Sequence, residues 1–315
     1  MPKENLIINV NHLNKRFHDF IAVKDISLQV KRGEIFGFLG PNGSGKTTTI
    51  RMLCGLLTPS GGSGTCLGYN MLTESSAIKK HVGYIPQHFS LYKFLTVQEN
   101  IILMAELYGI QNRKEKAIDL MDRLDLLSRK NQLSGTLSGG YKQRLSLACA
   151  LIHDPFLLLM DEPTASVDPT SRRDFWEIMH GLSAEGMTIL LTTHNMDEVE
   201  RCHRLAYVCD GQFLMSGSIK DIIETVNLTT FQVKGSNLIV LAKQLESTPG
   251  IDQVITFFDT LHVSSKDKNA IETAIKPYMG LGDYKWETIH STLDDVFIWL
   301  SINERKLGKM NVENN

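Results

Sequence analysis

The chain has 315 residues, a formal net charge of −2 and a pI near 6.6. Its length exceeds one average domain of about 100 to 200 residues, so two domains are expected. The near-neutral charge provides no extended basic surface, which argues against nucleic acid as a partner. The five cysteines lack C-x-x-C spacing and indicate ordinary thiols in a reducing compartment rather than a disulfide framework or a zinc site.

The start of the chain shows no secretory signal, because residues 1–5 are followed by strand-like alternation instead of a long apolar run. No segment reaches the ~18 consecutive apolar residues that a membrane-spanning helix needs. A cytoplasmic location is therefore expected, and any membrane pore that this chain serves would belong to another chain.

The first predicted elements are two strands and a phosphate-binding loop. Residues 23–30 and 34–39 are short apolar, β-branched runs around the turn 31–33, a pattern that predicts a hairpin. Residues 40–47 fit the pattern G-x-x-x-x-G-K-[ST], which indicates a bound nucleoside triphosphate. A glycine-rich loop alone can be an ordinary turn, but a strand before it and a predicted helix over 47–55 favour phosphate binding.

Each residue type in this loop suits one part of a magnesium nucleotide. Backbone N–H groups at Gly43 and Gly45 would face the phosphates, and Lys46 would reach the β and γ phosphates. Thr47 would direct its hydroxyl to Mg²⁺. Asp161 follows four apolar residues at the end of a predicted buried strand, where α/β sheets keep their ligand sites, and would hold the same ion.

The middle of the chain changes to helical periodicity over 97–127, which predicts an inserted helical lobe at about 88–155. Beyond it, a buried strand at 156–160, a helix at 170–183 and a second strand at 187–192 follow one another. Strand, helix and strand in this order indicate a parallel sheet.

Past residue 220 the composition becomes rich in strands, and the order strand-helix-strand-strand-helix-strand predicts a ferredoxin-like α+β domain. The strands are expected at 231–233, 254–258, 261–263 and 284–289, and the helices at 237–246, at 269–279 and from about 292. The predicted division is a first domain over 1–222, a second over 223–306 and a polar tail over 307–315.

The segment 137–144, Leu-Ser-Gly-Gly-Tyr-Lys-Gln-Arg, precedes the apolar strand that ends in Asp161-Glu162. Together with the loop 40–47, these segments resemble the ATP-binding subunits of ABC transporters over about residues 6–222. The resemblance implies an α/β fold, a P-loop ABC ATPase cassette. Such a cassette has a RecA-like core, an N-terminal antiparallel β subdomain and an inserted helical lobe, here followed by the small α+β domain.

The family also implies three catalytic residues. Glu162 matches the glutamate that orients the attacking water, and His194 matches the switch histidine that contacts the γ phosphate. Gln87 matches the glutamine that touches Mg²⁺ and the water and senses the membrane partner. The non-functional alternatives are a paired surface acid for Glu162, a structural histidine at a strand end for His194 and a solvated loop amide for Gln87.

Further ligands are implied for the nucleotide and the metal. Phe17 matches the aromatic residue that stacks on adenine, with an ordinary core phenylalanine as the alternative. Asp168 matches the D-loop aspartate, although Ser166-Val167 departs from the family's usual Gly-Leu. The expected nucleotide ligands are Phe17, Gly40, Pro41, Asn42, Gly43, Ser44, Gly45, Lys46, Thr47, Thr48, Ser138, Gly139, Gly140 and Asp168. The expected metal ligands are Thr47, Gln87 and Asp161.

The residues Ser138, Gly139 and Gly140 are predicted to begin a helix, whose N–H groups and dipole form an anion site. In the family this site faces the ATP of a second subunit, so the resemblance implies a dimer, with a homodimer expected, and two composite sites. A simple N-cap serine is the alternative.

Two further segments suggest a membrane partner. Large apolar residues follow Gln87 at positions 89, 91, 92, 94 and 95, where the family receives the coupling helices of a permease; lobe core is the alternative. The segment 291–300 resembles the closing motif of ATPase subunits from ABC-2-type exporters, and its pattern also suits an amphipathic capping helix.

These observations predict a subunit that hydrolyses ATP with Mg²⁺ and drives an ABC-2-type exporter through a separate integral-membrane permease. It is expected at the cytoplasmic face of the membrane. A soluble ABC ATPase acting on the ribosome or nucleic acid is the alternative, although such proteins usually carry two cassettes and basic linkers. A non-catalytic regulatory subunit is disfavoured because Lys46, Asp161, Glu162 and His194 are all present. The cargo is not encoded in this chain.

Overall fold

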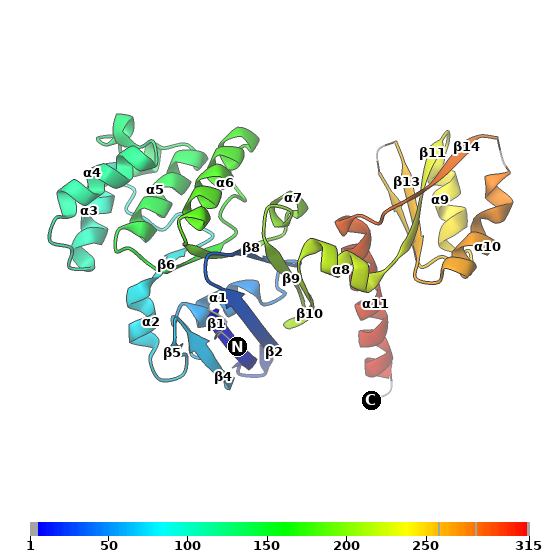
Figure 1. Cartoon of the computed structure of the whole chain (residues 1–315), viewed down its shortest axis with the longest axis horizontal. Helices are drawn as coiled ribbons and strands as arrows, with labels where there is room; N and C mark the ends of the chain where they lie inside the picture. Colours follow the sequence, from blue (N-terminus) through cyan, green and yellow to red (C-terminus); the bar gives the residue numbers. More distant parts are fainter. Residues whose placement is uncertain (1–5, 258, 281, 314–315) are drawn as a thin grey trace. The chain divides into compact units, whose positions relative to one another are not determined.

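The computed structural model describes residues 6–257, 259–280 and 282–313. It divides the chain into two compact units, Met1–Ser216 and Gly217–Asn315 (Figure 1). The boundary precedes helix α8 (Ile219–Val226), whereas the sequence-based boundary at residue 222 cuts through it. Ser218 begins this helix with a capping box and Ile222 is buried, so α8 is a continuous, capped element of the second unit.

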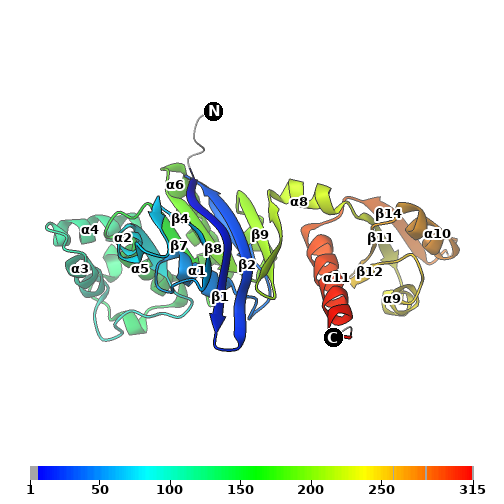
Figure 2. The same ribbon diagram turned by 90° about the horizontal axis from the view of Figure 1, so that it is seen from below.

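The first unit is built on one mixed sheet, with the strand order β5-β4-β1-β2-β10-β9-β3-β8-β7-β6 within the described residues. Its antiparallel part contains β1 (Leu6–Phe17), β2 (Phe20–Lys31), β4 (Gly61–Cys66) and β5 (Tyr69–Asn70). Figure 2 shows β1 and β2 running side by side. Its parallel part contains β3 (Ile35–Leu39), β6 (Val82–Ile85), β7 (Leu157–Asp161), β8 (Thr188–Thr193) and β9 (Arg204–Cys209). Strand β10 (Gln212–Gly217) joins the two parts beside β2.

The hairpin predicted from residues 23–39 is wrong. Strand β2 pairs along its length with β1, from Leu6 opposite Lys31 to Phe17 opposite Phe20. Strand β3 instead lies between β8 and β9, parallel to both, and all five of its residues are buried. A strand covered on both faces belongs in the centre of a parallel sheet, and so the chain crosses to another part of the sheet after the turn at Gly33.

The helical lobe is inserted between the neighbouring parallel strands β6 and β7. It contains α3 (Val97–Leu107), α4 (Arg113–Arg123) and α5 (Gly139–Leu151). A capping box between Thr96 and Glu99 starts α3. Ile101, Met121 and Leu145 pack in one buried cluster, which continues to α6 (Pro169–Ala184).

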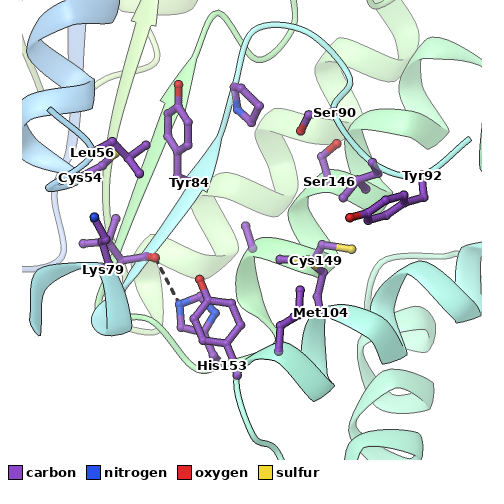
Figure 3. Close-up of a pocket in the computed structure, with 16 residues that line it drawn as sticks. Cys54, Leu56, Lys79, Tyr84, Ser90, Tyr92, Met104, Ser146, Cys149 and His153 are labelled. Carbon is purple, nitrogen blue, oxygen red and sulfur yellow. Dashed lines mark hydrogen bonds between the residues drawn. The ribbon is translucent and has the colours of Figure 1, made fainter. Parts of the chain in front are cut away.

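A groove of about 440 Å³ lies where the lobe meets β6 and α2 (Ser75–His81) (Figure 3). Tyr108 stacks on His153 in its wall, with ring centroids 3.9 Å apart. Tyr92 lines it and is exposed, while the nearby Phe94 ring is 90% exposed. The apolar residues after Gln87 therefore fall into two groups. Phe89 and Leu91 pack on the lobe core, whereas Tyr92 and Phe94 are exposed.

The second unit has a four-stranded antiparallel sheet, described in the order β12-β13-β11-β14. Its elements are β11 (Thr229–Gly235), α9 (Leu238–Glu246), β12 (Gln253–Thr256), β13 (Leu261–Ser265), α10 (Lys268–Met279) and β14 (Tyr284–Ile289). This order is that of a ferredoxin-like unit. Leu241 and Ile271 of the two helices share a buried core with Val233 and Val263 of the sheet. Residue 258, expected at the end of a strand, lies outside the described residues.

The last helix, α11 (Leu293–Glu313), replaces most of the predicted polar tail. The chain is helical through residues 307–313, and 314–315 lie outside the described residues. Leu293, Val296 and Phe297 are buried, as an amphipathic capping helix requires. No helix among the described residues is both long and apolar enough to cross a membrane.

Candidate functional site

The phosphate-binding loop connects β3 to α1 (Lys46–Leu53). Gly43 and Gly45 have φ values of 80° and 99°, which favour glycine. A Cβ at Gly45 would also lie 2.6 Å from the Ala22 carbonyl oxygen, so this glycine lets the loop approach β2. The sequence therefore places its glycines where the backbone needs them.

The Lys46 side chain turns back into its own loop. Its Nζ donates to the carbonyl oxygens of Gly40 at 2.7 Å and Pro41 at 2.9 Å. Burial lowers the pKa of Lys46, although the nearby carboxylates of Glu162 and Asp161 favour its charged form. The ammonium group is thus desolvated and paired only in part, and an anion in the adjoining cavity would stabilise it.

A cavity of about 420 Å³ adjoins this loop. Its lining includes most of the expected loop residues: Asn42, Gly43, Ser44, Gly45, Lys46, Thr47 and Thr48. Gln87 and Glu162 also face it. Phe17 does not line the cavity, which is lined instead by Phe20, the residue opposite Phe17 in the β1–β2 pair. Sequence reasoning missed Phe20.

Asp161 ends β7 beside the loop and is buried. Its Oδ1 accepts hydrogen bonds from Thr47 Oγ1 at 3.0 Å and Thr192 Oγ1 at 2.7 Å. No group of three or more His, Cys, Asp or Glu side chains that could hold a metal is found among the described residues. A carboxylate next to a threonine hydroxyl nevertheless fits Mg²⁺, which binds one or two protein oxygens and completes its shell with phosphate and water.

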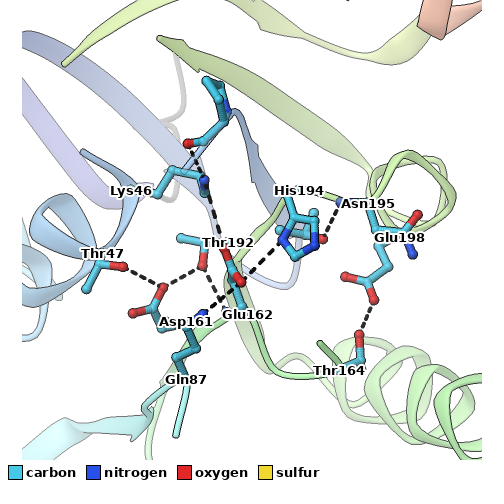
Figure 4. A network of polar contacts seen from close by, with 12 residues as sticks. Lys46, Thr47, Gln87, Asp161, Glu162, Thr164, Thr192, His194, Asn195 and Glu198 are labelled. Carbon is cyan, nitrogen blue, oxygen red and sulfur yellow. Dashed lines mark hydrogen bonds and ion pairs between the residues drawn. The ribbon is translucent and has the colours of Figure 1, made fainter. Parts of the chain in front are cut away.

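Glu162 is the point at which the expected catalytic residues meet (Figure 4). Its Oε2 accepts a hydrogen bond from Gln87 Nε2 at 3.0 Å and lies 3.2 Å from His194 Nδ1. Its Oε1 lies 4.0 Å from Lys46 Nζ. The Glu162 and Lys46 side chains are 9% and 5% exposed, so these two charges act on one another with little solvent between them.

The backbone of Glu162 is strained. Its φ of 47° lies in the left-handed region, which a side-chain-bearing residue adopts at a cost of order 1–3 kcal/mol. The Glu162 N–H donates to Thr192 Oγ1 at 2.9 Å, so β8 holds this turn in place. Strain of this kind accumulates at functional sites, where surrounding contacts fix it.

The signature residues, Ser138, Gly139 and Gly140, lie elsewhere in the unit and do not line the cavity beside the loop. Ser138 caps α5, and its side chain makes no capping hydrogen bond. A Cβ at Gly139 would lie 2.6 Å from the Ser166 carbonyl oxygen, and one at Gly140 would lie 2.6 Å from Ser171 Oγ. Both glycines therefore permit close packing of α5 on residues 166–171.

Asp168 also lies outside the cavity lining and caps α6, accepting the N–H of Ser171 at 3.0 Å. Hydrogen bonds from Ser171 hold the pKa of Asp168 below its usual range. One chain thus brings the loop, Asp161, Glu162, Gln87 and His194 together. In the same chain, residues 138–140 and Asp168 lie apart from this group.

The family model for the ABC transporter matches residues 23–165. The chain is 35% identical over 301 residues to the Nod factor export ATP-binding protein I of Burkholderia pseudomallei strain 1710b, covering 94% of this chain and 97% of that protein. It belongs to the ABC transporter ATP-binding proteins. It is also 43% identical over 218 residues to the probable multidrug ABC transporter ATP-binding protein YbhF of Escherichia coli K12. That match covers 69% of this chain but spans only 38% of YbhF.

Solved structures agree with this assignment of the first unit. An ATP-binding subunit of an ABC transporter matches with a TM-score of 0.64 and 29% identity, over 70% of this chain and 93% of that chain. A dimeric ATP-binding cassette in a post-hydrolysis state with ADP and Pi matches with a TM-score of 0.62 and 25% identity, over 67% of this chain and 98% of that chain. The first unit is therefore an ABC ATPase cassette, a domain that binds ATP.

Several site residues escaped sequence reasoning because they carry no motif of their own. Thr192 supports both Asp161 and Glu162 from the neighbouring strand. Thr164 and Glu198 form a buried hydrogen bond behind His194. The only sequence signal for Thr192 is a hydroxyl at the end of an apolar strand, which marks the edge where ligands bind.

Proposed function

We propose that this ABC transporter ATP-binding protein hydrolyses ATP and drives an ABC-2-type exporter through a separate permease, in which two copies close around two ATP molecules. The observation that carries the proposal is the convergence of Gln87, His194 and Lys46 on the Glu162 carboxylate, beside the Asp161–Thr47 pair. Phosphoryl transfer needs a positioned water and fixed charges more than covalent chemistry, and this arrangement would provide both.

Each residue would act through the contacts described above. Lys46 would exchange its carbonyl partners for phosphate oxygens, which would relieve its incomplete pairing. Glu162 would hold the attacking water, with Gln87 and His194 fixing the direction of its carboxylate. Thr47 and Asp161, with Gln87 nearby, would hold Mg²⁺, which would neutralise charge on the phosphates.

The dimer is supported by the position of the signature helix. Ser138 begins a helix of 13 residues with an uncommitted hydroxyl, and that end is not part of the loop cavity. N-terminal N–H groups of a helix suit a phosphate. In this proposal they serve the ATP held by the other copy, as the dimeric relative suggests. Phe17 and Asp168 do not line the loop cavity; their roles as the adenine-stacking residue and as the D-loop aspartate remain part of the proposal on the family resemblance alone.

The permease contact would use the groove beside the lobe and the exposed rings of Tyr92 and Phe94. Aromatic side chains on a surface suit a docking helix. The ABC-2 type rests on the closing segment 291–300 and on relatives named for Nod factor export and multidrug transport. This assembly would place the chain at the cytoplasmic face of the membrane.

The test is Glu162→Gln, which keeps the loop, Thr47 and Asp161 but removes the carboxylate charge. We expect hydrolysis to fall by about 10² to 10⁴-fold, as for loss of a general base, while ATP binding persists. The variant should then accumulate as an ATP-dependent dimer in size exclusion with Mg²⁺-ATP. Glu200→Gln, an exposed position, is the matched control. Glu162→Gln protein that turns over ATP at the parent rate contradicts the proposal.

A further inference from the structure

A second buried polar cluster lies behind His194, on the far side from the phosphate loop. Glu198, on α7 (Met196–Val199), is 3% exposed, and its Oε1 accepts a hydrogen bond from Thr164 Oγ1 (Figure 4). The same oxygen lies 3.8 Å from Arg172 Nε on α6. A carboxylate this deeply buried is costly unless it is paired and hydrogen-bonded. Thr164 provides the hydrogen bond, and Arg172 provides the opposite charge at a distance too long for a second one.

The cluster joins the two segments that carry the catalytic residues. Thr164 lies in the loop that follows Glu162, and the chain continues from it into residues 165–168. Glu198 comes one helical turn after His194, in α7. Asn195 caps this turn, because its side chain accepts the Asp197 N–H at 3.1 Å. The hydrogen bond between Thr164 and Glu198 therefore fixes the distance between the two segments.

The same cluster extends to the D-loop. Arg172 Nη2 donates to the carbonyl oxygen of Val167 at 3.3 Å, while its Nε faces Glu198. The guanidinium is thus hydrogen-bonded to residue 167 and forms an ion pair with the carboxylate of α7. A cavity of about 50 Å³ is lined by this cluster and also by Glu162 and His194. The buried cluster and the Glu162–His194 pair are therefore neighbours around one small cavity.

Packing alone does not account for this choice of residues. Replacing a buried ion pair with apolar side chains of similar volume is often neutral or stabilising, because desolvation offsets the Coulomb attraction. A charged, hydrogen-bonded cluster adds geometric specificity, because its contacts join particular atoms and so fix the relative positions of the segments that carry them. Here the fixed atoms lie on the segments that begin at Glu162 and at His194.

We propose that Glu198 is a positioning residue for ATP hydrolysis. Through Thr164 and Arg172 it holds residues 164–168 in register with His194, so that the switch histidine and the D-loop move together. The inference rests on the proposed hydrolysis of ATP but not on the permease or the cargo. Glu198 itself does not touch the nucleotide cavity beside the loop.

The test compares Glu198→Gln, Arg172→Gln and their double variant with Glu200→Gln, an exposed glutamate on the same segment. Glutamine at 198 keeps an oxygen for Thr164 and removes the charge that faces Arg172. We expect kcat to fall at least tenfold in each single variant, with the dissociation constant for ATP within twofold of the parent. The double variant should lose little more than either single one, because the residues act as a unit.

Hydrogen exchange supplies a readout that does not depend on turnover. The N–H groups of Ala165 and Val167 donate to the carbonyl oxygens of Glu162 at 3.3 Å and Thr164 at 3.1 Å. Peptides covering 163–168 should exchange at least fivefold faster in Glu198→Gln and Arg172→Gln without ATP, and at the parent rate in Glu200→Gln.

Two results would overturn the inference. One is unchanged exchange at 163–168 in Glu198→Gln. The other is a parallel loss of ATP affinity, kcat and melting temperature, which would make the cluster a general support of the fold. A parent chain without any ATP turnover would overturn the proposed function instead, and the exchange comparison would still decide whether Glu198 holds residues 164–168.

Discussion

Each of the two units contains a buried carboxylate that is paired with a histidine, at almost equal distances. His194 Nδ1 lies 3.2 Å from Glu162 in the cassette, and His262 Nδ1 lies 3.0 Å from Asp295 in the second unit. Their surroundings differ. The His194 side chain is 53% exposed, whereas the His262 and Asp295 side chains are 6% and 0% exposed.

The enclosed pair is saturated with partners. Asp295 also accepts from the N–H and hydroxyl of Thr292 and so begins α11, while His262 Nε2 contacts Gln232. Glu162 instead faces an open cavity from a strained backbone. The comparison indicates that the pairing of residue types does not identify a functional site. Glu162 differs from Asp295 in its access to a cavity and its strained backbone, and these two features support the proposed catalytic site.

The sharpest test of this contrast is His194→Ala. The imidazole lies 3.2 Å from the Glu162 carboxylate and is 53% exposed, so its loss should lower kcat by about 10²-fold, as for removal of one transition-state contact. The free energy of unfolding of the ATP-free chain should stay close to the parent value. Steady-state ATPase assays and urea unfolding measure the two quantities, and a large loss of stability would make His194 a structural residue.

The converse variant is Asp295→Ala. It leaves His262 without its buried partner and removes the cap of α11, so the second unit should lose about 3 kcal/mol. In a Trp176→Phe background, unfolding followed by the fluorescence of Trp286 and Trp299 reports on that unit, and Asp283→Ala at an exposed site is the control. ATP affinity should remain at the parent value. A lowered ATP affinity with unchanged unfolding would reverse the roles given to the two pairs.

A smaller effect follows from the lowered pKa of Lys46. Because burial disfavours the charged form in the fold, the unfolded chain binds more protons between the lowered pKa and the ordinary value of 10.5. The stability of the ATP-free cassette should therefore rise with pH across that window. Lys46→Met should lose this contribution, which urea unfolding at several alkaline pH values measures. A parent and variant with the same pH slope would show that Lys46 is not strained by burial.

Local patterns predicted the parts of the site that depend on adjacent residues. The loop glycines, Lys46 and the acid at the end of an apolar strand each have a stereochemical reason visible within a few positions. In the structure Gly43, Gly45 and Lys46 line one cavity, and Asp161 accepts a hydrogen bond from Thr47 of the same lining. The ferredoxin-like order was predictable for the same reason, because alternating strands and helices appear directly in the hydrophobic pattern.

Contacts between distant segments were not predictable. Strand β2 pairs with β1 and not with β3, and no turn signal in residues 31–33 indicates which of the two strands is its partner. The D-loop contact of Arg172 likewise joins elements that only the folded chain brings together. The proposed boundary at 222 falls inside α8, whose start the Ser218–Asp221 capping box marks in the sequence.

The close packing of the signature glycines alters how genetic data on this segment are interpreted. A methyl group at residue 139 would collide with the Ser166 carbonyl oxygen, and one at residue 140 with the Ser171 hydroxyl. An inactive alanine allele at either glycine would therefore report a displaced helix as readily as a lost nucleotide contact. Only Ser138, whose hydroxyl makes no capping hydrogen bond, offers a substitution that separates these two explanations.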